Sequence, residues 1–196
     1  LVGSEMCIRD SREELHHYRR LNSPLHGHET MQDVPGVDIT PSGSLGMVLS
    51  YGIGASIVSN KAAHQFKTYV FLGDGEEQEG NVSEAARHAA NLKLNNLVCI
   101  LDKNGKQLSR PTNDMNSNSD VATIWRGYGW NVINLEEGHN PLKISEAYDQ
   151  ANQYKSGPTL IIAHTHKGHG LYEADRHFCG YHTISNCTPE IVDAFI

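Results

Sequence analysis

The chain has 196 residues, of which 38% are hydrophobic, a formal net charge of −7 and a pI near 5.9. This length predicts one domain that can bury a proper core, and the acidic balance argues against nucleic-acid binding, which favours a basic face. No apolar run reaches the roughly 18 residues of a transmembrane helix, so we expect no membrane partner either. Signal-peptide, zinc-knuckle and disulfide-framework patterns are also absent, which makes the cytoplasm the expected compartment.

The first eleven residues do not look like part of the domain that follows them. Residues 1–11 contain no start methionine and resemble a translated adapter sequence. We therefore expect a non-native leader over residues 1–11 and a single domain over residues 12–196.

Strand-like and helix-like segments alternate along the chain. Runs of apolar residues predict strands at 68–72, 97–101, 130–135 and 159–164. Helical spacing predicts helices at 43–60, 81–93, 121–128 and 141–154. Asp120 can cap the third helix, and Pro141 suits the first turn of the fourth. The alternation favours an α/β fold with a doubly wound, mostly parallel sheet and helices on both faces. Cys99 lies in an apolar strand and is expected to be a buried thiol.

The most informative motif is Gly73-Asp74-Gly75, which follows the first strand, with Asn104 just after the second. If these strands are parallel neighbours, Asp74 and Asn104 emerge together at the edge where open α/β sheets bind ligands. Carboxylate and amide oxygens suit Mg²⁺. Glycines at positions 73 and 75 would let the backbone approach a diphosphate without a Cβ in the way.

A plainer explanation exists for each of these residues. Asp74 could be an ordinary turn residue, and Asn104 could form a turn before Gly105. The acidic residues that follow could simply favour a helix amino terminus. The polar segment 104–119, by contrast, is long for a loop in a compact domain, and such loops are usually functional.

The stretch from Gly73 to Gly80, taken with Asp102-Lys103-Asn104-Gly105, resembles the thiamine-diphosphate motif of transketolases. The resemblance extends from about residue 12 to the end of the chain. The further matching segments are Gly27-His28, residues 35–38, residues 43–46, residues 125–130, residues 137–139 and residues 165–170. The resemblance implies a thiamine-diphosphate-binding fold, specifically the diphosphate-binding domain, truncated at its amino terminus. It also implies transfer of a two-carbon ketol unit from a ketose phosphate to an aldose phosphate, with thiamine diphosphate and Mg²⁺ as cofactors.

The resemblance also assigns roles to individual residues. Lys106 would add a backbone carbonyl to the metal ligands Asp74 and Asn104. His28 would contact the donor sugar, and His182, or less readily His177, would lie near the acceptor and the diphosphate. Further cofactor contacts are implied for Gly43, Leu45, Gly73, Gly75 and His169. Glu79 matches an acid near the dimer interface, whereas Glu76 is interpreted as positioning the backbone or as solvated.

Parts of the family pattern are changed or lie elsewhere. Met47-Val48 replaces an expected Gln-Gly pair next to residues 43–46, whose backbone near Leu45 would meet the aminopyrimidine. The resemblance implies that the glutamate that activates the cofactor belongs to a pyrimidine-binding domain of the partner subunit. The implied partners are therefore sugar phosphates and a pyrimidine-binding domain or carboxyl-terminal subunit, in a homodimer or heterotetramer.

Three other interpretations remain at this point. The chain could be another thiamine-diphosphate enzyme, such as a deoxyxylulose-phosphate synthase or a 2-oxo-acid dehydrogenase component. It could instead be a non-catalytic cofactor-binding subunit, which the change at Met47-Val48 would permit. A zinc hydrolase is the third, because His164 and His166 share a strand face and His169 follows, although no HExxH motif or cysteine pair supports it.

Overall fold

The computed structural model describes residue 17 and residues 20–23, 43–107, 111–115 and 120–169. The chain divides into two compact units, Leu1–Leu45 and Gly46–Ile196. In the first unit the described residues include a short turn, in which the backbone N–H of Ser23 donates to the carbonyl of Arg20 at 3.1 Å. The elements below all belong to the second unit.

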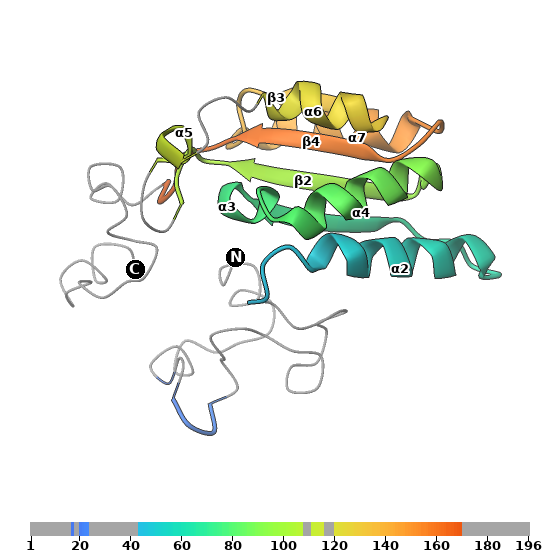
Figure 1. Ribbon diagram of the computed structural model, residues 1–196, viewed down its shortest axis with the longest axis horizontal. Coiled ribbons are helices and arrows are strands. Elements are labelled where there is room, and N and C mark those ends of the chain that lie inside the picture. Colours follow the sequence, from blue (N-terminus) through green and yellow to red (C-terminus); the bar gives the residue numbers. More distant parts are fainter. Residues whose placement is uncertain (1–16, 18–19, 24–42, 108–110, 116–119, 170–196) are drawn as a thin grey trace. The chain divides into compact units, whose positions relative to one another are not determined.

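The second unit is built on a four-stranded sheet with the order β1-β2-β4-β3 (Figure 1). The strands are β1 (Thr68–Gly73), β2 (Leu97–Lys103), β3 (Asn131–Leu135) and β4 (Thr159–His164). All three pairings are parallel. The carboxyl ends of the strands therefore meet at one edge, where Gly73 is level with Asp102 and Lys103 with His164. This confirms the expected α/β class with a parallel sheet.

Helices cover both faces of this sheet. The six helices described are α2 (Val48–Lys61), α3 (Asp74–Glu77), α4 (Gly80–Asn91), α5 (Thr112–Met115), α6 (Val121–Tyr128) and α7 (Pro141–Gln153). Buried side chains of α2, α4 and α6 form a core on one face, and those of α7 form a smaller core on the other. None of the described helices is both long and apolar enough to cross a membrane.

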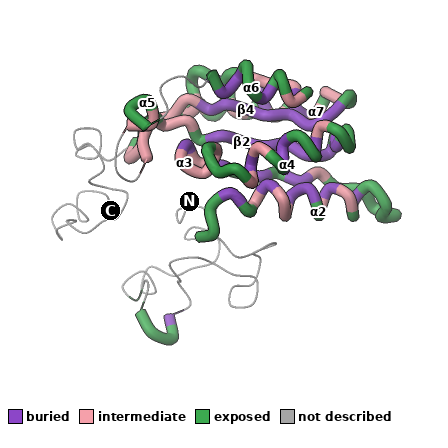
Figure 2. The backbone as a smooth tube through the Cα atoms, in the orientation of Figure 1, coloured by how far each residue is buried: buried purple, intermediate pink, exposed green. Residues whose placement is uncertain are grey.

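Side chains of strand β2 contribute to both cores. Leu97, Cys99 and Leu101 join the larger core, whereas Val98 and Ile100 join the core under α7. Successive side chains of a strand point to opposite faces, so a strand covered on both sides is apolar throughout. Strands β2 and β4 are accordingly buried along most of their length and form the centre of the tube in Figure 2. Burial raises the pKa of the Cys99 thiol well above its ordinary value, with Glu76 and Glu77 adding to the effect.

The edge strand β1 is less completely covered. Val70 and Leu72 point into the larger core, but Tyr69 and Phe71 on the opposite face remain 42% and 50% exposed. Tyr69 makes an edge-to-face contact with Tyr148 of α7, with ring centroids 5.5 Å apart. The α7 face of β1 is thus only partly packed by the described residues.

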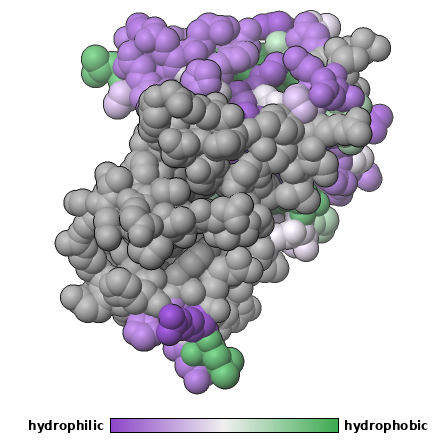
Figure 3. All heavy atoms as spheres, turned by 90° about the vertical axis from the view of Figure 1, so that its left-hand side faces the viewer, coloured by the Kyte–Doolittle hydropathy of each residue, from purple (hydrophilic) through white to green (hydrophobic). Residues whose placement is uncertain are grey.

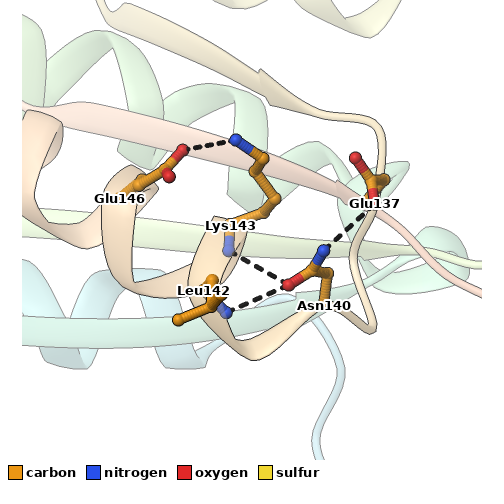
Figure 4. Close-up of polar contacts among 5 residues, drawn as sticks. All are labelled: Glu137, Asn140, Leu142, Lys143 and Glu146. Carbon is orange, nitrogen blue, oxygen red and sulfur yellow. Dashed lines mark hydrogen bonds and ion pairs between the residues drawn. The ribbon is translucent and has the colours of Figure 1, made fainter.

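Helix α7 has a well-formed amino terminus (Figure 4). The side-chain oxygen of Asn140 accepts from the backbone N–H groups of Leu142 and Lys143 at 3.1 and 3.5 Å, and its amide donates to Glu137 at 3.1 Å. An asparagine cap followed by Pro141 satisfies the free N–H groups of the first turn. Asp120 caps α6 in the predicted way, because its side chain accepts from the N–H of Thr123.

One predicted helix begins later than expected, and one helix was not predicted. The helix expected at 43–60 begins only at Val48, because Gly43 and Gly46 have φ values of 108° and 82°, outside the helical region. The one-turn helix α3 at residues 74–77 was not among the predicted elements. The long segment 104–119 also contains structure, namely an isolated bridge between Lys106 and Pro111 and the short helix α5.

Candidate functional site

Asp74 lies at the carboxyl edge of the sheet, directly after β1 and at the start of α3. Its side chain is only 6% exposed, and Oδ2 accepts a hydrogen bond from the backbone N–H of Gly105 at 2.6 Å. Gly105 immediately follows Asn104, which comes directly after β2. The structure therefore brings the Gly73-Asp74-Gly75 motif and the Asn104 segment together at the predicted edge.

The electrostatic environment of Asp74 suits a cation. Burial raises the pKa of its carboxyl group, and the nearby charge of Asp102 raises it further. The backbone N–H groups of Gly105 and Asn104 and the charge of Lys103 act in the opposite direction and do not cancel the rise. A divalent cation beside this buried carboxylate would compensate the charge that burial leaves poorly solvated.

The side chain of Asn104 is held in a defined orientation. Its Nδ2 donates to Oδ2 of Asp102 at 3.3 Å, and its Oδ1 accepts from the backbone N–H of Lys106 at 3.0 Å. Asp102 is held in turn by the hydroxyl of Thr165, which donates to Oδ1. Neither Asp102 nor Thr165 was predicted to have a role. Only the strand pairing shows that the ends of β2 and β4 are neighbours.

The glycines of the motif leave open space. A Cβ on Gly75 would come no closer than 3.7 Å to another residue, Gln107, and a Cβ on Gly73 would have no such neighbour within 4 Å among the described residues. Packing within the described protein therefore does not require glycine at either position. The open space is compatible with the expectation that a diphosphate approaches the backbone there.

The structure distinguishes the two interpretations of Glu76, namely that it positions the backbone or that it is solvated. Its Oε1 accepts from the backbone N–H of Gly46 at 3.0 Å, and Oε2 lies 3.5 Å from the N–H of Gly73. The side chain is half-buried and positions the backbone rather than extending into solvent. Glu79 is exposed and precedes α4, and a Cβ on Gly46 would lie 2.7 Å from the Cβ of Glu79.

Glu77 has a partner that sequence reasoning missed. The indole Nε1 of Trp125, a residue only 1% exposed, donates to Oε1 of Glu77 at 2.9 Å. Trp125 belongs to α6, so this bond ties α3 to a helix far along the chain. An indole N–H in a core requires such an acceptor.

The loops after β3 and β4 also meet at this edge. The ring of His139 stacks on His169, with centroids 3.7 Å apart, and its Nε2 accepts from the backbone N–H of His166 at 2.7 Å. Gly138 makes the approach possible, because a Cβ there would lie 2.4 Å from the carbonyl oxygen of His164. His139, which carried no predicted role, is thus the packing partner of the predicted cofactor residue His169.

The remaining predicted residues stand as follows. His28, His182 and His177 lie outside the described residues, as do residues 1–11. Gly43 and Leu45 belong to the first unit, and Leu45 is 61% exposed. Figure 3 faces the side of Figure 1 toward which the arrows of β2 and β4 point, and the described atoms visible there are mostly hydrophilic.

The described histidines at the end of β4 are not arranged as a set of zinc ligands. Within the described part of the chain, no three or more His, Cys, Asp or Glu side chains are grouped to hold a metal ion. His164 instead lies 3.8 Å from Oε1 of Glu136. The geometry therefore gives no support to a zinc hydrolase built on His164, His166 and His169.

A parallel sheet flanked by helices, with a buried carboxylate and an oriented carboxamide at its carboxyl edge, defines an α/β domain of the ligand-binding type. Comparison with known proteins narrows this class. The sequence model of the family described as "Transketolase, thiamine diphosphate binding domain" matches residues 1–183. The chain belongs to this family.

Individual relatives agree with this assignment. The chain is 36% identical over 163 residues to one of the subunits of the apulose-4-phosphate transketolase of Phocaeicola vulgatus, covering 82% of the chain and 56% of the relative. It is 39% identical over 188 residues to transketolase 1 of Saccharomyces cerevisiae, covering 90% of the chain and 27% of the relative. The solved transketolase of Campylobacter jejuni superposes with a TM-score of 0.75 at 28% identity, covering 84% of the chain and 26% of that structure. The chain therefore spans about half of the Phocaeicola relative and about a quarter of the yeast transketolase.

Proposed function

We propose that this chain provides the diphosphate- and Mg²⁺-binding half of a transketolase-type active site. In this proposal Asp74 and Asn104 bind Mg²⁺ through side-chain oxygens, and Lys106 adds its backbone carbonyl. The observation that carries the proposal is the 2.6 Å hydrogen bond from the Gly105 N–H to the buried Asp74 carboxylate, which joins the two ligand-bearing segments. Carboxylate, amide and carbonyl oxygens form the donor set that Mg²⁺ prefers, so the residues present fit this ion.

The reaction we propose is transfer of a two-carbon ketol unit from a ketose phosphate to an aldose phosphate. Bound thiamine diphosphate would supply the nucleophilic carbon and the electron sink for this chemistry. The protein would bind the diphosphate at Gly73 and Gly75 and compensate its charge through the metal site. His28 and His182 would contact the sugar phosphates, and His169 and Leu45 the cofactor.

This site would be completed by a pyrimidine-binding domain outside the chain. Two of the relatives are named as subunits of transketolases, and the chain covers 56% and 55% of their lengths. We propose that the chain works in the cytoplasm, either as one subunit of a split enzyme or as part of a full-length one. The assembly would be a heterotetramer or homodimer, with Glu79 near the subunit interface.

The decisive experiment is Mg²⁺-dependent binding of thiamine diphosphate, measured by calorimetry on the chain assembled with its pyrimidine-binding domain and on the Asp74→Asn and Asp74→Ala variants of that assembly. Residues that only orient metal ligands contribute about 10- to 100-fold to metal affinity, so removing a direct ligand should cost more than about 100-fold. Asp149→Asn is the matched control, because Asp149 is exposed on α7, away from the site, and should bind like wild type.

The Asp74→Asn variant is expected to fold. Burial already disfavours the charged carboxylate, and the asparagine oxygen can still accept from Gly105. A loss of binding with an unchanged circular dichroism spectrum would therefore support the metal role. Unchanged affinity in both Asp74 variants would refute the proposed function.

A further inference from the structure

The carboxylate of Asp102 connects the segment after β2 with the loop after β4. Asp102 belongs to β2 and is level with Ala163 of the neighbouring strand β4. Its Oδ1 accepts from the hydroxyl of Thr165, and its Oδ2 accepts from Nδ2 of Asn104 at 3.3 Å. Each carboxylate oxygen therefore has a donor of its own, and the two donors come from segments that are far apart in the sequence.

Thr165 lies on backbone that is held at two points. Its own N–H donates to the carbonyl of Lys103 at 3.2 Å, which extends the contact between β4 and β2 beyond the end of β4. The N–H of the next residue, His166, donates to Nε2 of His139 in the loop after β3 at 2.7 Å. The hydroxyl that reaches Asp102 is thus anchored to the ends of two other strands.

The bond to Asp102 determines which end of the Asn104 carboxamide points in which direction. A carboxylate only accepts hydrogen bonds, so the NH₂ end of the carboxamide has to face Asp102. The oxygen end then faces away from Asp102, and Oδ1 accepts from the backbone N–H of Lys106 at 3.0 Å. A carboxamide oxygen has two acceptor sites, and this bond uses one of them. This orientation presents an oxygen, rather than an NH₂ group, to a cation.

The orientation matters because Asn104 belongs to the segment that meets Asp74. The backbone N–H groups of Asn104 and Gly105 both bond to the buried Asp74 carboxylate, the second at 2.6 Å. Mg²⁺ binds oxygen ligands, whereas the NH₂ end of an amide has only donors to offer. Turning the carboxamide over would therefore remove Asn104 from a metal site at Asp74 without moving its backbone.

We propose that Asp102, held by Thr165, is a positioning residue that keeps the Asn104 carboxamide oxygen turned toward a Mg²⁺ ion at Asp74. Asp102 acts through Asn104 in this role and not as a ligand. The inference rests on the proposed function, and it adds two residues to which the family resemblance assigned no role. Residues that orient metal ligands contribute about 10- to 100-fold to metal affinity.

The charge of Asp102 has to be separated from its hydrogen bonds. Burial chiefly raises the pKa of Asp74 and the charge of Asp102 adds to the rise, so the two carboxylates lie close enough to interact. An anion at this position would attract a cation even if it did not orient Asn104. Because Asp102 is exposed, salt should screen that attraction, but salt should not cancel the effect of a misoriented carboxamide.

The test uses the chain assembled with its pyrimidine-binding domain. Equilibrium dialysis gives the Mg²⁺ concentration at which half of the thiamine diphosphate is bound. Asp102→Asn should raise this concentration about 10- to 100-fold, because an asparagine can also donate to Asn104 and so permits the inverted orientation. The ratio to wild type should persist at about 1 M KCl, where the Debye length is about 3 Å.

Variants of Thr165 test the same role without changing any charge. Thr165→Val should raise the required Mg²⁺ concentration about two- to tenfold, the equivalent of one hydrogen bond, and Thr165→Ser should restore the wild-type value because it keeps the hydroxyl. Asp114→Asn is the charge-matched control, since Asp114 is an exposed acid on α5. It should match wild type at both salt concentrations.

A loss in Asp102→Asn that persists in salt, together with a loss in Thr165→Val that Thr165→Ser recovers, supports the positioning role. A loss in Asp102→Asn that disappears at high salt would show that only the charge matters. That result, an unchanged Mg²⁺ requirement in Asp102→Asn, or wild-type behaviour of Thr165→Val would overturn the inference. Failure of the proposed function appears in different variants, as wild-type Mg²⁺-dependent binding by both Asp74→Asn and Asp74→Ala.

Discussion

Two glycines on α2 should respond in opposite ways to the same substitution. Gly52 is buried against β1, and a Cβ there would lie 2.3 Å from Cγ2 of Val70 and 3.4 Å from Cδ1 of Leu97. Val70 is itself 3% exposed, so it has little room to move. Gly54, two residues later on the same helix, would place a Cβ in open space. Alanine is therefore too large at position 52 and harmless at position 54.

The magnitudes follow from these distances. Overpacking a core costs about 1–3 kcal/mol, and replacing a helical glycine by alanine returns about 0.5–1 kcal/mol. Gly52→Ala should therefore lower the free energy of unfolding by up to about 2.5 kcal/mol, whereas Gly54→Ala should raise it by about 0.5–1 kcal/mol. Urea denaturation followed by circular dichroism would show this as opposite shifts of the midpoint at unchanged slope. Shifts of the same sign would refute the close docking of α2 on β1.

Three further predictions concern the site. Gly75→Ala should weaken binding of thiamine diphosphate while changing the free energy of unfolding by less than about 0.5 kcal/mol. Gly127→Ala, also in open space but inside α6, should leave the affinity unchanged and raise the free energy of unfolding by about 0.5–1 kcal/mol. Because the pKa of Asp74 is raised, its carboxylate protonates at a higher pH than an ordinary aspartate. Mg²⁺-dependent binding, followed by titrations at decreasing pH, should therefore fall before the range near 3.9 is reached, and constant affinity down to that range would contradict the raised pKa. Trp125→Phe should cost about 1–3 kcal/mol in urea denaturation, because Glu77 loses its donor; an equal cost in a Glu77→Ala background would exclude that explanation.

Much of the fold was predictable because its signals are local. The apolar runs of β2 and β4, the cap at Asp120 and the first-turn proline Pro141 lie within a few residues of the elements they define. The parallel arrangement then followed from the alternation of strands and helices. The pairing of the Gly73-Asp74-Gly75 motif with Asn104 was predictable for the same reason, since it requires only two neighbouring parallel strands.

The parts that could not be predicted depend on contacts between distant segments. Glu76 bonds to Gly46 and Trp125 to Glu77, and no periodic pattern announces either pair. Helix α3 was missed because four residues are too few to show helical spacing. Helix α2 begins later than predicted because Gly43 and Gly46 have positive φ values. A glycine in a sequence does not reveal which φ it adopts.

The position of β4 between β2 and β3 has a consequence for how the protein is made. Strands β1 and β2 and the helices between them are synthesised early, so Asp74 can meet Gly105 within one local unit. The apolar strand β2 then keeps one unpaired edge until β4 emerges near the end of the described chain, and such edges favour aggregation. The bond between Thr165 and Asp102, which helps to orient Asn104, also forms only then. On a ribosome, Asp74 would thus be in place well before Asn104, the second proposed metal ligand, is held in its final orientation.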